Sequence, residues 1–258
     1  GARADHGAQF FTVRSPEFGE WTERWRGEGL IQEWARGWAT GPAQGSADVT
    51  SGAGHPRYVV REGMNSLAKR LAGEISAAGA SVHMSVQIEA ISQSGEGWWA
   101  CSTDGRVYTA AALVLTCPVP QSLRLLAQGS VILSPADEAR LAAIEYAPCL
   151  CGLFVLDGES ALPEPGAVQL REGSVTWIAD NRRKGLAGER SVITVHAGPE
   201  FSRAHFESAE DEVMPVLRAA LDPWLAAGAT IIEAQLKRWR YALPTTTHPE
   251  RLLRAEGH

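Results

Sequence analysis

Several signals that identify a functional class at sight are absent from this sequence. It contains no G-x-G-x-x-G and no Walker A loop, so it holds no complete dinucleotide site. Its seven histidines form no H-E-x-x-H motif and its four cysteines no C-x-x-C motif, so we expect no metal centre. No run reaches the roughly 18 apolar residues of a membrane span. We therefore expect no membrane partner.

An excess of positive charge and a disulfide framework are missing too. The chain has 24 Lys+Arg against 30 Asp+Glu, a formal net charge of −6, whereas nucleic-acid binding needs a basic footprint. The four cysteines are expected to be reduced thiols, typical of a cytoplasmic protein, and the polar first residues predict no signal peptide. We therefore expect a small-molecule partner and no nucleic acid.

The residues that are present predict a globular chain. Its 258 residues suit one large domain or two small ones, and 45% apolar residues allow a sizeable core. The nine tryptophans are unusual, because Trp lines flat ligand sites as well as cores. Trp spacing of four residues predicts a helix over 18–38, followed by a loop over 40–55.

One part of the chain has the pattern of helices and buried strands. An amphipathic helix is expected over 65–78, with Asn65 or Ser66 as its cap and Gly79 at its end. The apolar run 111–116 is typical of a buried parallel strand. Shorter strands are predicted at 57–60, 81–84, 86–92, 98–101 and 107–109.

The part over 121–240 alternates apolar and polar residues, as a one-sided antiparallel sheet does. Its predicted strands are 150–156, 175–180, 192–197 and 231–241, and its predicted helices are 121–127, 136–144 and 208–221. The expected fold class is therefore α/β plus α+β, in two parts with a ligand between them.

Few residue patterns indicate chemistry by themselves. Ser66 and Lys69 match S-x-x-K, but the partner motifs of acyl enzymes are absent, so we assign no catalytic side chain. Basic clusters occur at 182–184 and 237–240. They are either solvated faces or a pocket for a phosphorylated or carboxylated ligand, with Trp239 and Tyr241 as flat walls.

Several segments together resemble the renalase-like family of flavin-dependent oxidoreductases, relatives of the amine oxidases. The segments, in the family's order, are Asp5-His6-Gly7-Ala8-Gln9-Phe10-Phe11, Gly63-Met64-Asn65-Ser66-Leu67-Ala68, Val86-Gln87-Ile88, Leu113-Val114-Leu115-Thr116-Cys117-Pro118-Val119-Pro120-Gln121, Trp177-Ile178-Ala179-Asp180-Asn181, Val195-His196-Ala197 and Trp239-Arg240-Tyr241. The family's glycine-rich FAD-binding unit and its closing FAD segment are not in this sequence. We therefore expect the middle of a longer enzyme, one that binds FAD weakly without those segments.

The resemblance implies a two-part flavin amine oxidase-like fold, with an incomplete FAD-binding part and a mostly antiparallel substrate sheet with helices. Residues 1–16 and 57–120 would belong to the FAD-binding part, residues 17–56 and 121–240 to the substrate part, and 241–258 would return toward the first. The implied cofactor is noncovalent FAD.

The implied reaction is oxidation of dihydro isomers of NADH and NADPH by O₂, which gives NAD(P)+ and hydrogen peroxide. The alternatives are a generic flavin amine oxidase or desaturase with the same fold, and a non-catalytic binding module. An aromatic pair beside the flavin would favour amines, and a basic rim would favour dihydropyridine dinucleotides.

The resemblance also implies site residues. Those matched to cofactor binding are Gly7, Ala8, Gln9, Phe10, Val86, Thr116, Cys117 and Pro118. Those expected on the substrate side are Asn181, Trp239, Arg240 and Tyr241, with Lys184 as a possible helper of Arg240. If 231–241 is one strand, Arg240 faces away from Trp239 and Tyr241, so its ligand role requires the strand to end near Trp239.

Overall fold

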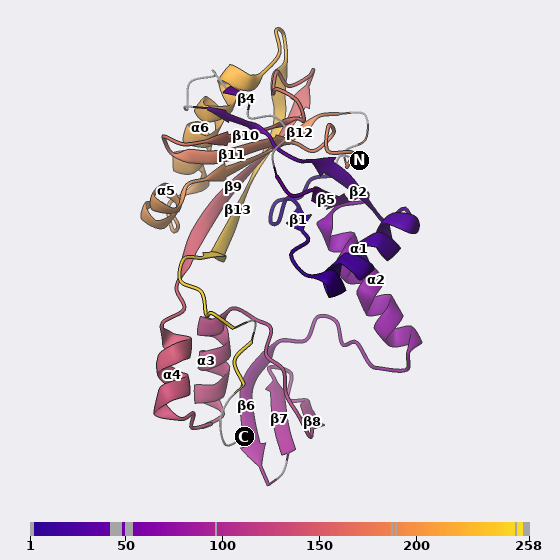
Figure 1. Cartoon of the computed structure of the whole chain (residues 1–258). Helices are drawn as coiled ribbons and strands as arrows, with labels where there is room; N and C mark the ends of the chain where they lie inside the picture. Colours follow the sequence, from indigo (N-terminus) through magenta and orange to yellow (C-terminus); the bar gives the residue numbers. More distant parts are fainter. Residues whose placement is uncertain are drawn as a thin grey trace. The chain divides into compact units, whose positions relative to one another are not determined.

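The structure is a computed structural model that describes residues 3–41, 48–49, 54–95, 97–186, 188, 190–250 and 252–254. The chain forms two compact units, which we describe separately (Figure 1). Unit 1 comprises Gly1–Ala78 and Ala147–Ala242, and unit 2 comprises Gly79–Tyr146 and Leu243–His258. The boundaries of the functional domains predicted from the sequence differ from the limits of these two units, and they stay a prediction.

A seven-stranded sheet is the centre of unit 1. Its strands, in spatial order, are β13 (Thr230–Pro244), β9 (Tyr146–Asp157), β12 (Val192–Ala197), β11 (Val175–Asp180), β10 (Ala167–Leu170), β3 (Ala39–Gly41) and β4 (Asp48–Val49). The pairs β9–β12, β12–β11 and β11–β10 are antiparallel, and β10–β3 is parallel. The mostly antiparallel sheet predicted from the alternating pattern is therefore confirmed.

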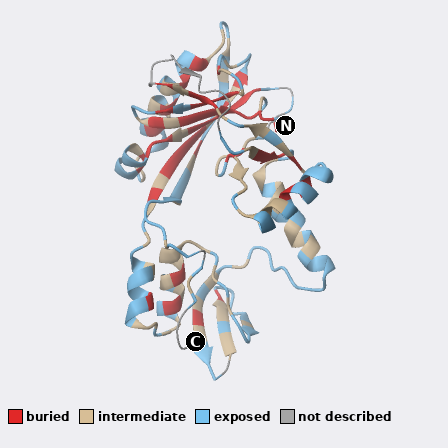
Figure 2. Ribbon diagram, in the orientation of Figure 1, coloured by how far each residue is buried: buried red, intermediate tan, exposed pale blue. Residues whose placement is uncertain are grey.

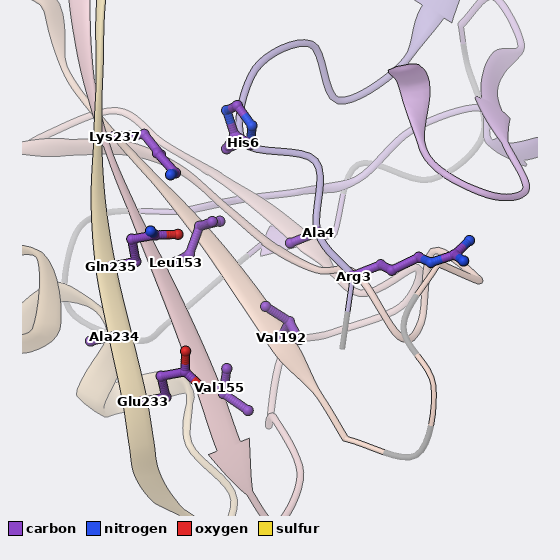
Figure 3. A pocket seen from close by; sticks show the side chains of 10 residues that line it. All are labelled: Arg3, Ala4, His6, Leu153, Val155, Val192, Glu233, Ala234, Gln235 and Lys237. Atoms are coloured by element: carbon purple, nitrogen blue, oxygen red, sulfur yellow. The ribbon is translucent and has the colours of Figure 1, made fainter. Parts of the chain in front are cut away.

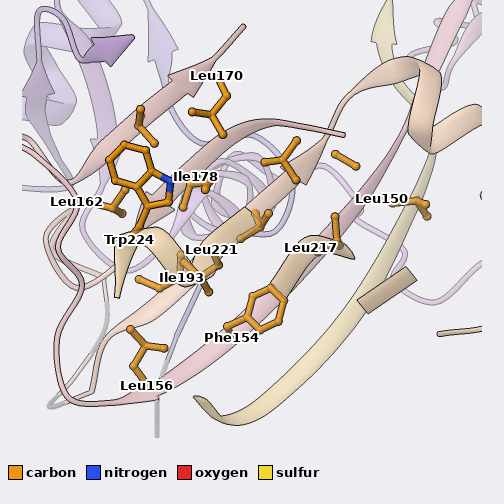
Figure 4. Close-up of a cluster of buried hydrophobic side chains, with 14 of the residues drawn as sticks. Leu150, Phe154, Leu156, Leu162, Leu170, Ile178, Ile193, Leu217, Leu221 and Trp224 are labelled. Carbon is orange, nitrogen blue, oxygen red and sulfur yellow. The ribbon is translucent and has the colours of Figure 1, made fainter. Parts of the chain in front are cut away.

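One face of this sheet packs against helix α6 (Glu210–Leu221). Phe154, Ile193 and Leu217 are among its fully buried side chains, and Figure 4 shows them in one cluster. Gly152 leaves room for the helix, because a Cβ there would lie 3.1 Å from Leu217 Cδ1 and 2.6 Å from Phe154 Cε2. Buried residues are concentrated in the strands of this sheet (Figure 2).

The other face of the sheet carries different side chains. Leu153, Thr194, His196 and Trp177 occupy the alternate positions of their strands, so they point away from the α6 core. The N-terminal segment 5–10 bonds to this face. The two faces thus separate the hydrophobic core from a surface where polar and aromatic groups gather.

A second, three-stranded sheet of unit 1 has the order β1 (Phe11–Thr12), β5 (Arg57–Val60) and β2 (Ile31–Ala35). Helices α1 (Pro16–Gly27) and α2 (Met64–Ala77) contribute apolar side chains to the cluster that covers it. Trp25, Ile31 and Tyr58 are the buried centre of this cluster. The strand at 57–60 and the helix predicted over 65–78 are confirmed.

The N-terminal cap of α2 differs from the prediction. Neither Asn65 nor Ser66 caps the helix, whose N-cap residue is Gly63. Instead the Met64 N–H donates to Asp5 Oδ1 at 2.8 Å, so the cap comes from a residue 59 positions earlier. A carboxylate at a helix N-terminus satisfies an otherwise unpaired donor and interacts favourably with the helix dipole.

Unit 2 contains an antiparallel meander of β6 (Ile88–Ser94), β7 (Gly97–Ser102) and β8 (Val107–Ala110). Helices α3 (Val119–Gln128) and α4 (Pro135–Ala142) belong to the same unit. Gly129 allows close packing at the end of α3, because a Cβ there would lie 1.8 Å from the Ile91 carbonyl oxygen. The predicted hairpin and the two helices are confirmed.

The predicted helix over 18–38 is wrong beyond residue 27. α1 ends at Gly27, and Gly29 has a φ of 71°, a left-handed conformation that stops the helix. Trp34 and Trp38, spaced four apart like helix positions, lie in and just after β2. The four-residue spacing of Trp34 and Trp38 therefore reflects the aromatic contacts of their rings and does not indicate a helix. Most of the predicted loop over 40–55 lies outside the described residues.

The buried strand predicted at 111–116 is not formed. These residues are irregular and mostly exposed, with Val114 84% exposed. A parallel strand needs neighbours on both sides, and no strand pairs with this run among the described residues. The strand predicted at 81–84 is also irregular, while β10 and helix α5 (Pro199–Ala204) were not predicted.

No helix in the described part of the chain is long and apolar enough to cross a membrane.

Replacement of Leu217 by Ala is expected to lower the free energy of unfolding of unit 1 by about 2–5 kcal/mol, because it leaves a cavity in the α6 core. Ile75→Ala, at a helical residue that is 49% exposed, is the control and should lose far less. Urea denaturation measures both. Equal losses would show that α6 does not carry the core.

Candidate functional site

The segment 5–10 is fixed to the open face of the large sheet by buried hydrogen bonds. The Asp5 N–H donates to Asn181 Oδ1 at 3.0 Å, and Thr194 Oγ1 donates to the Asp5 carbonyl at 2.8 Å. The Asn181 amide in turn donates to Thr194 Oγ1 and to the Val192 carbonyl, both at 2.8 Å. Residues about 180 positions apart therefore hold this segment in one place.

An ion pair completes this anchor. Lys184 Nζ lies 2.8 Å from Asp5 Oδ2 and donates to Gln9 Oε1 at 3.1 Å. Lys184 has no exposed surface and Asp5 is 8% exposed. Burial lowers the pKa of Lys184, and the attraction of Asp5 acts in the opposite direction. Lys184 therefore has no surface from which to help a ligand, in contrast to the predicted role.

Gln9 and Phe10 both point inward. Gln9 Nε2 donates to the carbonyls of Asp5 at 2.7 Å and of Gly7 at 3.0 Å, so its amide is satisfied within the segment. The ring of Phe10 joins an aromatic cluster, which also contains Trp34, Trp38 and Trp177. The Arg57 guanidinium lies 3.8 Å from the Trp38 ring centroid.

Gly7 and Ala8 are the outward part of the segment. Ala8 is exposed, and neither of their N–H groups donates to another described residue. A Cβ on Gly7 would lie 3.2 Å from Trp239 Cζ2, so only glycine permits this contact comfortably. Trp239 Nε1 donates to the His6 carbonyl at 3.0 Å, and the two rings stack at 5.3 Å.

Two imidazoles next to this segment are held in their neutral form. Burial lowers the pKa of His196 to about 4, and its Nε2 has no hydrogen-bond partner among the described residues. Burial and the Lys237 ammonium also lower the pKa of His6, whose Nδ1 lacks a described partner. Both are therefore uncharged at neutral pH.

The other residues predicted on the substrate side are not grouped. β13 continues to Pro244, so the condition for a ligand role of Arg240 is not met. Arg240 pairs with Glu207 at 2.7 Å and covers the Phe206 ring, on the strand face opposite Trp239. Tyr241 shares the Trp239 face by alternation. Asn181 is fully buried, and its described hydrogen bonds are all internal.

The remaining predicted cofactor residues belong to unit 2. Val86 is half-buried just before β6, Thr116 is exposed, and Pro118 is the N-cap residue of α3. Cys117 Sγ lies 3.1 Å from Ser122 Oγ. The cofactor roles of these residues stay predictions.

Asp5, Thr194 and Lys184 were missed as members of the anchor, and so was the buried, neutral His196 beside it. Asp5 stood in the quoted motif, but nothing in the sequence shows that its partners are Lys184 and Met64. The described residues contain no group of three side chains able to hold a metal ion.

A family model for flavin-containing amine oxidoreductases matches residues 22–253. The chain belongs to this family. The expected fold and family type are thereby confirmed, and the family's flavin agrees with the expected FAD. The renalase-like subfamily is a finer assignment that this match does not address.

Solved structures share the fold at low identity. An oxidoreductase from Methanosarcina mazei has a TM-score of 0.54 at 15% identity, over 73% of this chain and 46% of that one. Reduced UDP-galactopyranose mutase has a TM-score of 0.56 at 13% identity, over 73% of this chain and 41% of that one. Wild-type putrescine oxidase bound to putrescine has a TM-score of 0.53 at 16% identity, over 70% of this chain and 39% of that one. The chain thus spans less than half the length of these proteins.

The outward backbone of the segment fits a flavin. Gly7 and Ala8 present N–H groups without described partners, beside a half-exposed tryptophan ring. Free backbone donors and a small residue suit the edge of a flat, acceptor-rich ring. Gln9 and Phe10 would act by holding this backbone in place, because their side chains point inward.

Replacement of Lys184 by Met should lower the free energy of unfolding by about 3–5 kcal/mol, because Asp5 would stay buried without its cation. The double variant with Asp5→Asn should lose less than the sum of the single losses. Arg70→Met, in exposed ion pairs with Glu74 and Glu28, is the control and should lose far less, because exposed pairs contribute little to stability. Additive losses in the double variant would show that the two charges are not coupled.

The buried His196 predicts a dependence of stability on pH. Between pH 6.5 and about 4 the unfolded chain binds a proton that folded His196 refuses, so the free energy of unfolding falls as the pH falls. The expected fall is about 3 kcal/mol in total. His196→Gln should remove it, and His83→Gln, at an exposed residue, should not. Denaturation curves over this pH range measure the difference.

Proposed function

We propose that the protein is an FAD-dependent oxidoreductase that oxidises dihydro isomers of NADH and NADPH with O₂, giving NAD(P)+ and hydrogen peroxide. The family match supports the flavin and the reaction class. The resemblance of the D-x-G-A-Q-F and L-T-x-P-V-P-Q segments to renalase-like proteins supports the substrate. The substrate, the acceptor and FAD use by this protein are parts of the proposal.

The fixed segment 5–10 is the observation that carries this proposal. Five hydrogen bonds or ion pairs join Asp5 and Gln9 to the sheet and to α2. Burial of the charged groups in this anchor carries a desolvation penalty, so we expect a segment held in this way to have a positional role. Its outward part, Gly7–Ala8, belongs to the stretch Gly7, Ala8, Gln9 and Phe10 that the family resemblance matches to cofactor binding.

The flavin, when bound, accepts a hydride from the substrate and passes the electrons to O₂. This chain's residues supply position and polarity. The Gly7 and Ala8 N–H groups would hold the flavin, and Trp239 would provide a flat apolar wall beside them. The neutral His6 and His196 keep further positive charge away from a cationic pyridinium product.

Amine oxidation is the second candidate, because putrescine oxidase shares the fold. The aromatic cluster around Phe10 offers the kind of faces that bind an ammonium group. The Trp38 face is already covered by Arg57, however, and a second cation there would be repelled. This observation favours the dinucleotide substrate.

The substrate assay separates these candidates. The FAD-loaded enzyme should consume O₂ with dihydro isomers of NADH and NADPH, and release one hydrogen peroxide for each NAD(P)+. Putrescine should give no turnover above background. Turnover with putrescine alone would replace the proposal with amine oxidation, and a purified full-length protein without a flavin absorbance band would leave a binding module.

Trp239→Ala is expected to lower kcat/KM for the dihydro substrate by roughly threefold to tenfold, because a ring contact and the hydrogen bond to His6 are lost. Trp239→Phe should lose less, since it keeps a ring. Trp21→Ala, at a tryptophan that is 44% exposed on α1, is the matched control. Unchanged kinetics for Trp239→Ala would remove this residue from the site.

A further inference from the structure

A cavity opens on the same sheet face, beside His6 and toward the β13 edge (Figure 3). Its volume is about 380 Å³. The side chains that line it come from the N-terminal segment and from β9, β12 and β13. They include Arg3, His6, Leu153, Val155, Val192 and Lys237. All of them belong to unit 1.

The walls of the cavity divide by chemistry. Leu153 and Val155 on β9 and Val192 on β12 form an apolar floor. Glu233, Gln235 and Lys237 occupy every second position of β13, so all three face this floor. Figure 3 shows Lys237 and His6 at one end and Glu233 at the other. The cavity is therefore apolar below and charged at its two ends.

Lys237 is an available cation. Among the described residues no carboxylate pairs with it and no group accepts a hydrogen bond from it. Its neighbours on β13 differ, since Arg238 donates to the Phe206 and Ser208 carbonyls and Arg240 pairs with Glu207. Lys237 is also half-buried as a residue, and it lines the cavity.

We propose that this cavity binds the phosphate or carboxylate group of a small ligand, with Lys237 as its cation and the ligand's flat apolar body on Leu153, Val155 and Val192. Arg3, which is largely exposed and 3.9 Å from Glu62, adds positive charge at the rim. The neutral His6 ring can donate one N–H to the same anion. The pocket does not depend on the proposed redox reaction.

Glu233 fixes the direction of the ligand. It lies four residues from Lys237, about 13 Å along the strand. An anion placed near Glu233 would be repelled, whereas one placed at Lys237 is attracted. The bound ligand therefore has its anion at the His6 end of the cavity and a neutral or cationic group at the Glu233 end.

Binding of phenyl phosphate to the purified chain tests the pocket directly. Isothermal titration calorimetry should show one saturable site at low salt, and phenol, the uncharged analogue, should bind at least tenfold more weakly. Lys237→Gln should weaken phenyl phosphate binding roughly tenfold to a hundredfold, the range for hydrogen bonds to charged groups. Lys237→Arg keeps the charge and should retain most of the affinity.

The controls use the other charges of the chain. Lys69→Gln, on α2, should leave binding unchanged, and Glu233→Gln should leave it unchanged or strengthen it, because it removes a repulsive charge. Far-UV circular dichroism of each variant checks that the fold is retained. Equal affinity of the wild type and Lys237→Gln would overturn the proposal, as would the absence of saturable binding.

A spectroscopic measurement adds an independent check. An anion at Lys237 offsets the ammonium that lowers the pKa of His6, so NMR should show that pKa rise when phenyl phosphate binds. Asp5, Lys237 and His196 are the titratable groups that act on His6. The rise should disappear in Lys237→Gln. An unchanged His6 titration in the saturated wild type would place the anion elsewhere and contradict the proposal.

Displacement of phenyl phosphate by competing ligands identifies which kind of anion the cavity binds. NADH that displaces phenyl phosphate from the wild type shows a dinucleotide phosphate in the pocket, and phenylacetate that does so shows a carboxylate. Both results support the anion site and differ only in its natural ligand. Failure of redox activity leaves the calorimetric result intact, so this proposal and the proposed function fail separately.

Discussion

Unit 1 depends on one buried carboxylate. The Asp5 carboxylate accepts from the Met64 N–H at the start of α2 and pairs with Lys184. The Asp5 backbone N–H donates to Asn181 and its carbonyl accepts from Thr194, so Asp5 joins a helix, a sheet and the N-terminal segment at one point. Buried charges of this kind stabilise little by themselves, but a misplaced partner leaves an unpaired charge. We infer that the pair specifies one arrangement of these elements more than it adds stability.

The large sheet uses its two faces for different purposes. The face toward α6 carries the large hydrophobic cluster, and Gly152 lets the helix approach closely. The opposite face carries the aromatic cluster around Phe10, the hydrogen bonds that hold Asp5, and the open cavity. Alternation along each strand allows this, because adjacent residues point to opposite faces. A rigid core thus supports a surface that is free to vary in chemistry.

Local sequence patterns correctly predicted the elements whose structure is determined by residues close together in the sequence. The α2 periodicity, the hairpin around Asp104 and the alternation of β11 and β12 were sufficient, since neighbours in sequence settle them. Prediction failed where contacts between residues far apart in the sequence determine the structure. Trp34 and Trp38 have helical spacing but pack as a strand, and the run around Val114 has no strand partner. The anchor was missed for the same reason, because Asn181 and Lys184 were expected beside a ligand and their buried partners lie about 180 positions away in the sequence.

The distance along the chain between Asp5 and Lys184 has a consequence for biosynthesis. Lys184 is synthesised 179 residues after Asp5. On a ribosome that adds about 5–20 residues each second, Asp5 spends roughly 10–35 seconds without its partner. The segment 5–10 therefore cannot reach its anchored arrangement until β11 and the Lys184 that follows it have been synthesised.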